Sequence, residues 1–172
     1  MHRFPWAAWG LLVVVIDLPL RGWDVAPDVV GYAWVLYGLW GAAARPFLVA
    51  RVAAVVGLAV WVVTGTPLFA ADRYVILQYT ALTVEAVVWA VLVHQLCTGV
   101  MAVGIPEDLE RWAHRLALAA VALGVLLVGS LVLYATSGLA LYGLAVVAAV
   151  VVGLLAVVLL QRVSRSGALT AA

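Results

Sequence analysis

Long apolar stretches separated by short polar breaks dominate the pattern of this chain. Six such stretches can be delimited, each long enough to cross a bilayer as a helix. They cover residues 4–20, 27–44, 47–69, 74–103, 116–135 and 139–160. The breaks contain charged or turn-forming residues, such as Arg45-Pro46 and Thr136-Ser137-Gly138. The pattern therefore predicts an all-α, polytopic transmembrane helical bundle of six spans, with residues 1–172 forming a single transmembrane domain.

Composition favours the same class. Apolar residues make up 68% of the chain and charged residues 10%, which is too little polar surface for a soluble domain of this size. The formal net charge of +1 provides no basic face for nucleic acid, so the lipid bilayer is the expected partner. Cys97 is the only cysteine, which rules out an intrachain disulfide. No nucleotide-binding loop or metal-ligand spacing occurs in the sequence, so no cofactor and no metal are predicted.

The arginines predict the orientation, because cytoplasmic loops of membrane proteins are enriched in basic residues. With the N-terminus inside, Arg21 and Arg73 fall outside and seven arginines fall on or near the cytoplasmic side. These seven are Arg3, Arg45, Arg51, Arg111, Arg115, Arg162 and Arg165. Both termini are therefore expected in the cytoplasm (N-in/C-in). Because no signal-peptide cleavage site follows the first stretch, it is expected to be a retained span. The excess of Ala, Val, Leu and Gly without any Lys indicates a GC-rich bacterial genome, and hence the bacterial inner (plasma) membrane.

The first predicted outer connection carries three acids, Asp17, Asp24 and Asp28. The two stretches that it joins are near the lower length limit for a span, so the connection is expected to dip into the membrane. One interpretation is a binding site. The other is an ordinary helix start, with Pro27 in the first turn, Asp28 beside it and Asp24 as a cap.

The same segment carries a resemblance to a known group. Ile16-Asp17 followed by Asp24-x-x-Pro27-Asp28-x-x-Gly31-Tyr32 resembles a signature of small, uncharacterised bacterial multi-pass membrane proteins. This resemblance covers about the first quarter of the chain and implies no activity.

A weaker resemblance is to tryptophan-rich sensory (translocator) proteins, which bind porphyrins. It is carried by a proline-rich first loop and an aromatic second span, with Trp23, Pro27, Trp34, Tyr37 and Gly41. The other spans lack that family's Asn- and Trp-rich pattern, and six spans replace five.

The fourth stretch is the only one rich in polar side chains. At 100° per residue, Gln78, Glu85 and Trp89 fall on one helix face, and His94 falls roughly opposite. Counted from Tyr74, Glu85 lies near the membrane midplane, where a charge costs about 3 kcal/mol on insertion scales.

Such an acid is either a structural residue, neutral or paired with Arg51, or a proton- or cation-responsive site. We expect the Arg51 side chain to extend to the cytoplasmic interface and to leave Glu85 protonated. His94, without a second ligand at suitable spacing, is expected to be a hydrogen-bonded core residue and not a metal ligand.

The fifth and sixth stretches carry few polar side chains and are expected to be scaffold. Ala145, Ala149 and Gly153 recur every four residues. This stripe of small residues indicates either close packing within the chain or the seam of a homodimer. Residues 106–115 are expected to form the cytoplasmic start of the fifth span, with Glu107 and Arg111 paired one turn apart.

These features favour binding or translocation of a small solute or cation. Glu85 would be the proton-linked group beside His94, in a cavity formed by the first four spans, with the outer acids at its mouth. An alternative is an intramembrane enzyme acting on a lipid or isoprenoid, with Glu85 or Asp17 as the general acid. A further alternative is an accessory subunit of a membrane complex.

Overall fold

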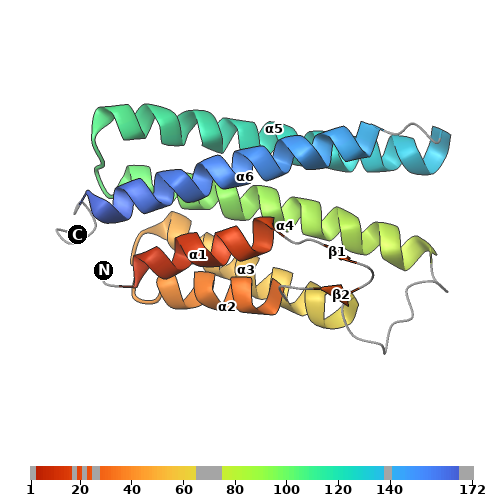
Figure 1. The fold of residues 1–172 in the computed structure, drawn as a ribbon, viewed down its shortest axis with the longest axis horizontal. Coiled ribbons are helices and arrows are strands. Elements are labelled where there is room, and N and C mark those ends of the chain that lie inside the picture. The colour runs from red at the N-terminus through yellow and green to blue at the C-terminus, as the bar shows by residue number, and fades with distance from the viewer. Residues whose placement is uncertain are drawn as a thin grey trace.

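The computed structural model of the protein describes residues 3–16, 19–20, 23–24, 28–64, 75–137 and 141–166. Helices account for nearly all of these residues (Figure 1). The helices are α1 (Phe4–Val15), α2 (Asp28–Gly38), α3 (Arg45–Thr64), α4 (Val75–Ala102), α5 (Glu107–Ser137) and α6 (Leu141–Arg165). Two short antiparallel strands, β1 (Pro19–Leu20) and β2 (Trp23–Asp24), lie between α1 and α2.

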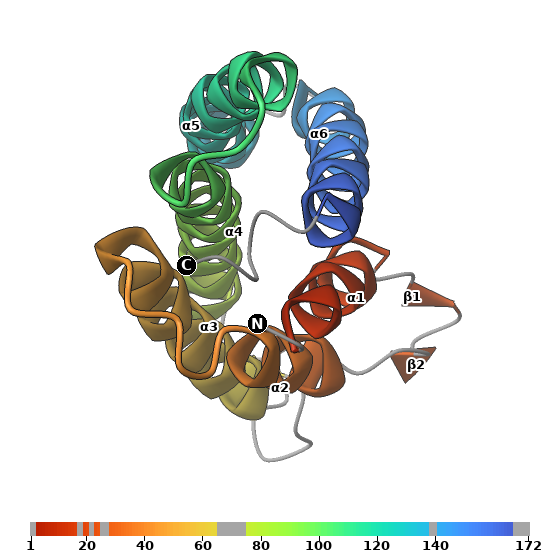
Figure 2. The same cartoon turned by 90° about the vertical axis from the view of Figure 1, so that its left-hand side faces the viewer.

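The six helices form a closed ring. Each packs against the next in sequence, and α6 packs against α1, as the view along the bundle shows (Figure 2). Part of the buried core lies at the end where α1 and α3 begin. There Phe4 and Phe47 are fully buried, and their ring centroids lie 5.9 Å apart in an edge-to-face arrangement.

Local sequence accounts for several helix ends. Pro5 lies in the first turn of α1, and three acids occupy the first turn of α5, next to the positive end of its dipole. The turns after α2 and α4 contain Gly41 and Gly104, whose φ values of 83° and 79° favour glycine. The predicted pair in α5 is confirmed, since Arg111 Nε lies 3.9 Å from Glu107 Oε1.

Glycines bring α1 and α2 into backbone contact. A Cβ added to Gly10 would lie 2.5 Å from the carbonyl oxygen of Gly31, and one added to Gly38 would lie 2.3 Å from the amide nitrogen of Ala7. The short helices therefore form one closely packed pair, a common device in membrane proteins.

Within the described residues, four helices are long and apolar enough to cross a membrane. They cover residues 45–62, 79–102, 107–134 and 141–165. The protein is thus a multi-pass, all-helical membrane protein. As expected for the start of the fifth span, α5 runs continuously from Glu107 into its apolar part.

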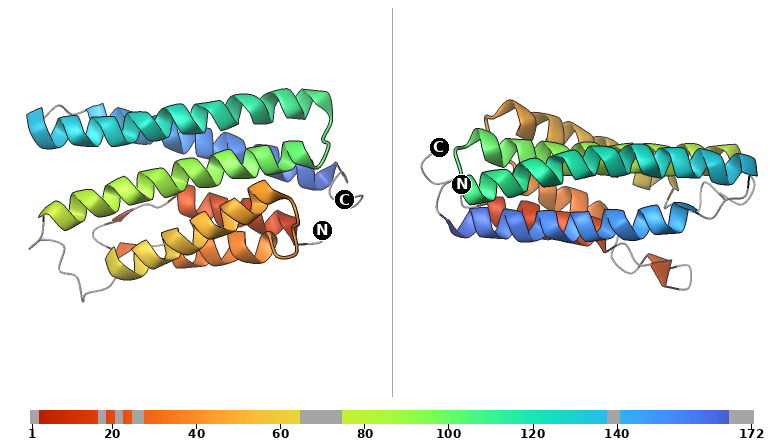
Figure 3. Two further views of the ribbon diagram at one scale, coloured as in Figure 1. Left: turned by 180° about the vertical axis from the view of Figure 1, so that it is seen from behind. Right: turned by 90° about the horizontal axis from the view of Figure 1, so that it is seen from above.

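The helices within the first two predicted spans are shorter than the apolar stretches. The helices found at 4–20 and 27–44 have only 12 and 11 residues, because α1 ends at Val15 and a turn with Gly41 follows α2. At 1.5 Å per residue each is less than about 20 Å long, whereas the hydrocarbon core is about 30 Å thick. Figure 3 shows both ending part-way along the longer helices.

The described arginines gather at one end of the bundle. Arg3, Arg45 and Arg111 lie at the starts of α1, α3 and α5, while Arg162 and Arg165 lie in the last turn of α6. These helix ends are all on the same side in Figure 1. The up-and-down order of the helices therefore produces the charge asymmetry noted in the sequence.

Candidate functional site

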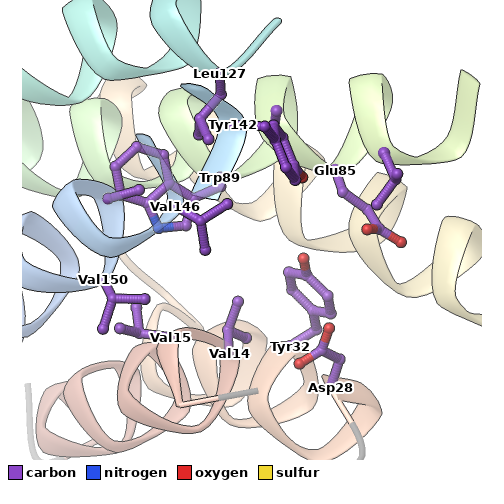
Figure 4. Close-up of a pocket in the computed structure, with 13 residues that line it drawn as sticks. Val14, Val15, Asp28, Tyr32, Glu85, Trp89, Leu127, Tyr142, Val146 and Val150 are labelled. Carbon is purple, nitrogen blue, oxygen red and sulfur yellow. The ribbon is translucent and has the colours of Figure 1, made fainter. Parts of the chain in front are cut away.

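A cavity of about 190 Å³ lies at the level where α1 ends and α2 begins (Figure 4). Its walls come from α1, α2, α4, α5 and α6. The described residues that line it are Val14, Val15, Asp28, Tyr32, Leu82, Glu85, Ala86, Trp89, Leu127, Tyr142, Val146, Ala149 and Val150. Two carboxylates predicted as separate site elements, Asp28 and Glu85, therefore face the same space.

Asp28 and Tyr32 come from the first turns of α2. Asp28 is the first residue of the helix, which agrees with the interpretation as a helix start for this residue, while Pro27 lies outside the described residues. The Asp28 side chain also lines the cavity, where its Oδ1 atom is shielded from solvent. Tyr32, one turn later, is 4% exposed. Its ring packs on Gly57 of α3, where an added Cβ would lie 2.4 Å from Cζ of the tyrosine. The absence of a side chain at Gly57 thus provides the room for Tyr32.

Glu85 and Trp89 come from α4 and lie one turn apart. Both line the cavity, which confirms that they share a helix face. Glu85 is about one turn from the middle of α4, on the side of its N-terminus. Gln78 belongs to α4, but its side chain lies outside the described part of the structure.

The contribution of α6 was not expected from the sequence. The last two helices were expected to be scaffold, whereas Tyr142, Val146, Ala149 and Val150 form one wall of the cavity (Figure 4). The carboxylate of Glu85 is close enough to act electrostatically on the Tyr142 hydroxyl. Conversely, no described lining residue comes from α3. The spacing of these four α6 residues, which places them on one face, was the available signal.

Arg51 lies away from Glu85. Phe47 packs on Gly99 of α4, where an added Cβ would be 2.3 Å from the Phe47 ring. Because α3 and α4 are antiparallel, Arg51, one turn after Phe47, is level with about residue 95, which is about 15 Å along α4 from Glu85. Arg51 is half-buried, and its Nε is shielded from solvent without a hydrogen-bond partner among the described residues.

His94 also lies outside this cavity. Its Nδ1 atom is 3.1 Å from the carbonyl oxygen of Ala117, so the imidazole N–H donates to α5. The predicted role as a hydrogen-bonded core residue fits this contact. The ring borders a separate apolar groove between α4 and α5, so it is not the neighbour of Glu85 that the sequence suggested.

The side chains of the other two acids of the outer connection lie outside the described part of the structure. Asp17 lies outside the described residues, and Asp24 belongs to β2 with its side chain outside the described part. Within the part that is described, no group of three His, Cys, Asp or Glu residues comes close enough to hold a metal ion.

The stripe of small residues on α6 faces the interior of the chain. Ala145 and Ala149 are buried against Ala86 and Leu127, and a Cβ on Gly153 would lie 2.6 Å from the Val15 side chain. This is the packing within the chain that the first of the two interpretations describes.

Comparison with known proteins identifies no relative: no protein-family model, no curated protein and no solved structure matches the chain.

Proposed function

We propose that the protein binds or translocates a small solute or cation, with Glu85 as the proton-linked group and Asp28 as a second carboxylate. The observation that carries the proposal is the cavity in which both carboxylates meet the hydroxyl-bearing rings of Tyr32 and Tyr142. An intramembrane acid is costly and is typically retained for a function. Outside bulk water, ionisation of a carboxyl group costs free energy that a bound cation offsets, so binding of the cation is linked to proton release.

The proposal includes a topology of six passes with both termini in the cytoplasm of a bacterium. The clustered arginine ends support a cytoplasmic location for that side of the bundle. The short helices α1 and α2 would reach the outer surface through the connection that contains β1 and β2. Pairing of these strands, with Leu20 opposite Trp23, satisfies some of the backbone hydrogen bonds that such a connection needs at membrane depth.

The size of the cavity favours a small ligand over the alternative of a lipid or isoprenoid substrate. Pockets for drug-sized ligands measure roughly 300–1,000 Å³, whereas this one measures about 190 Å³. A purely accessory subunit has no need for such a cavity, which counts against that alternative.

Infrared spectroscopy of the purified protein in lipid nanodiscs tests the proposal. The Glu85→Gln variant identifies the band of the protonated Glu85 carboxyl by its loss. We expect this band at neutral pH and expect it to decrease when a bound cation displaces the proton. Glu107→Gln is the matched control, because its side chain is 85% exposed at the arginine-rich end.

The thermal stability of the same variants provides the second measurement. Glu85→Gln should unfold close to the wild-type temperature and lose the response to cations, while Glu107→Gln should retain the response. A collapse in the stability of Glu85→Gln, or a wild-type spectrum without a cation-sensitive Glu85 band, contradicts the proposal.

A further inference from the structure

The cavity has two chemically different ends (Figure 4). The carboxylates of Asp28 and Glu85 lie toward one end, with the hydroxyls of Tyr32 and Tyr142. The other end is formed by valines, and Trp89 lies beside it. The valines at this end are Val14, Val15, Val146 and Val150. A ligand that fits both ends must combine a charged, hydrogen-bonding group with an apolar body.

We infer that the ligand is a short primary alkylammonium ion, an assignment of substrate class that rests on the proposed function. The ammonium group donates hydrogen bonds to the carboxylates of Asp28 and Glu85, a charge-assisted geometry stronger than a neutral contact. The alkyl chain lies along the valines and is removed from water.

Other small ligands match only one end of the cavity. A bare metal ion uses oxygen ligands and leaves the valines without a partner, and the described side chains bring only two carboxylates to this cavity. A neutral alcohol of the same size fills the apolar end and can donate one hydrogen bond, but it carries no positive charge to replace the proton of Glu85. The combination of both ends therefore favours an amphiphilic cation.

The volume limits the length of the alkyl chain. A cavity of about 150 Å³ is known to hold benzene, which has six heavy atoms. At about 190 Å³ the cavity matches an ion of similar size, such as butylammonium. Methylammonium leaves the apolar end empty, and octylammonium is too long.

Calorimetric titration of the full chain in nanodiscs, with simultaneous measurement of proton release, tests this assignment. The probes are methylammonium, butylammonium, octylammonium, sodium chloride and butanol at equal ionic strength. We expect the affinity to be highest for butylammonium and butanol to be silent. Partition into lipid, in contrast, increases steadily with chain length, so affinity that rises through octylammonium overturns the assignment.

Substitution at the apolar end supplies the matched test. Val150→Phe fills the space occupied by the alkyl chain, while Val151→Phe places the same ring on the lipid-facing side, where Val151 is 51% exposed. We expect Val150→Phe to weaken butylammonium binding by about fourfold for each methylene group displaced, without changing methylammonium binding. Val151→Phe should bind as wild type. Val150→Leu, a smaller change, gives the same direction if the phenylalanine variant does not fold.

The outcomes separate the two proposals. If sodium releases the Glu85 proton as well as butylammonium does, the alkylammonium assignment is wrong and the proposed function stands. If methylammonium does so, the assignment of the apolar end to an alkyl chain is wrong. If no cation binds or releases a proton, both are wrong. Equal losses for methylammonium and butylammonium in Val150→Phe also overturn the assignment of the apolar end.

Discussion

Gly57 on α3 leaves room for the ring of Tyr32, a residue of α2 that lines the cavity. A Cβ at this position would lie 2.4 Å from Cζ, 2.6 Å from Cε1 and 2.7 Å from the hydroxyl oxygen of Tyr32. Because Tyr32 is 4% exposed, its ring cannot avoid the methyl group by moving into solvent. Gly57→Ala should therefore push the ring toward the cavity.

The expected cost follows from these contacts. Overpacking of a buried site costs about 1–3 kcal/mol. A glycine-to-alanine change in a helix without such a contact stabilises by up to about 1 kcal/mol through helix propensity. Gly129 on α5 is the matched control, because a Cβ there meets nothing within 4 Å. We expect Gly57→Ala to be less stable than wild type and Gly129→Ala to be at least as stable.

Equilibrium unfolding with sodium dodecyl sulfate in mixed micelles measures both free energies. The Tyr32→Leu background identifies the cause, since it removes the ring that the new methyl group strikes. In that background the cost of Gly57→Ala should largely disappear, giving a coupling between the two sites of the size found for residues in contact, about 0.5–3 kcal/mol. The cation response should be lost in Gly57→Ala and retained in Gly129→Ala.

Two results refute this reasoning. One is a Gly57→Ala protein as stable as Gly129→Ala. The other is an undiminished cost in the Tyr32→Leu background, which would mean that the contact with the ring is not its origin.

Three further predictions concern the packing and the topology. Gly38→Ala should lower the free energy of unfolding by at least about 3 kcal/mol, the upper end for overpacking. Its Cβ would strike the Ala7 backbone, which cannot move aside as a side chain can. Detergent unfolding measures this change, and a near-neutral result refutes the close contact of α1 and α2. Ala149→Leu should destabilise the protein by about 1–3 kcal/mol, whereas Val147→Leu, at a position 62% exposed, should stay within about 0.5 kcal/mol in the same assay. Reporter fusions or cysteine labelling should place the connection between α4 and α5 in the cytoplasm and the connection between α5 and α6 outside, and the reverse assignment contradicts the proposed topology.

The sequence by itself predicted the helical class, the approximate position of each helix and the arrangement of residues within one helix. Long apolar stretches leave few alternatives to a helix in a membrane, because the backbone must satisfy its hydrogen bonds internally. Helical spacing likewise placed Glu85 and Trp89 on one face, and the structure confirms it. The helices α1 and α2 are shorter than the apolar stretches that predicted them, since Ile16 and residues 39–44 are described but not helical.

Only the tertiary structure decided which faces meet. It brings Asp28 and Glu85 to one cavity, adds Tyr142 from a helix expected to be scaffold, and leaves Arg51 and His94 elsewhere. Hydrophobic periodicity could not predict these contacts, because lipid is as apolar as the protein interior. Val93 is fully buried and Val125 is 71% exposed, although both are apolar residues within candidate membrane spans. The spacing of residues fixes positions around one helix axis, whereas the contacts between helices depend on how all six pack together.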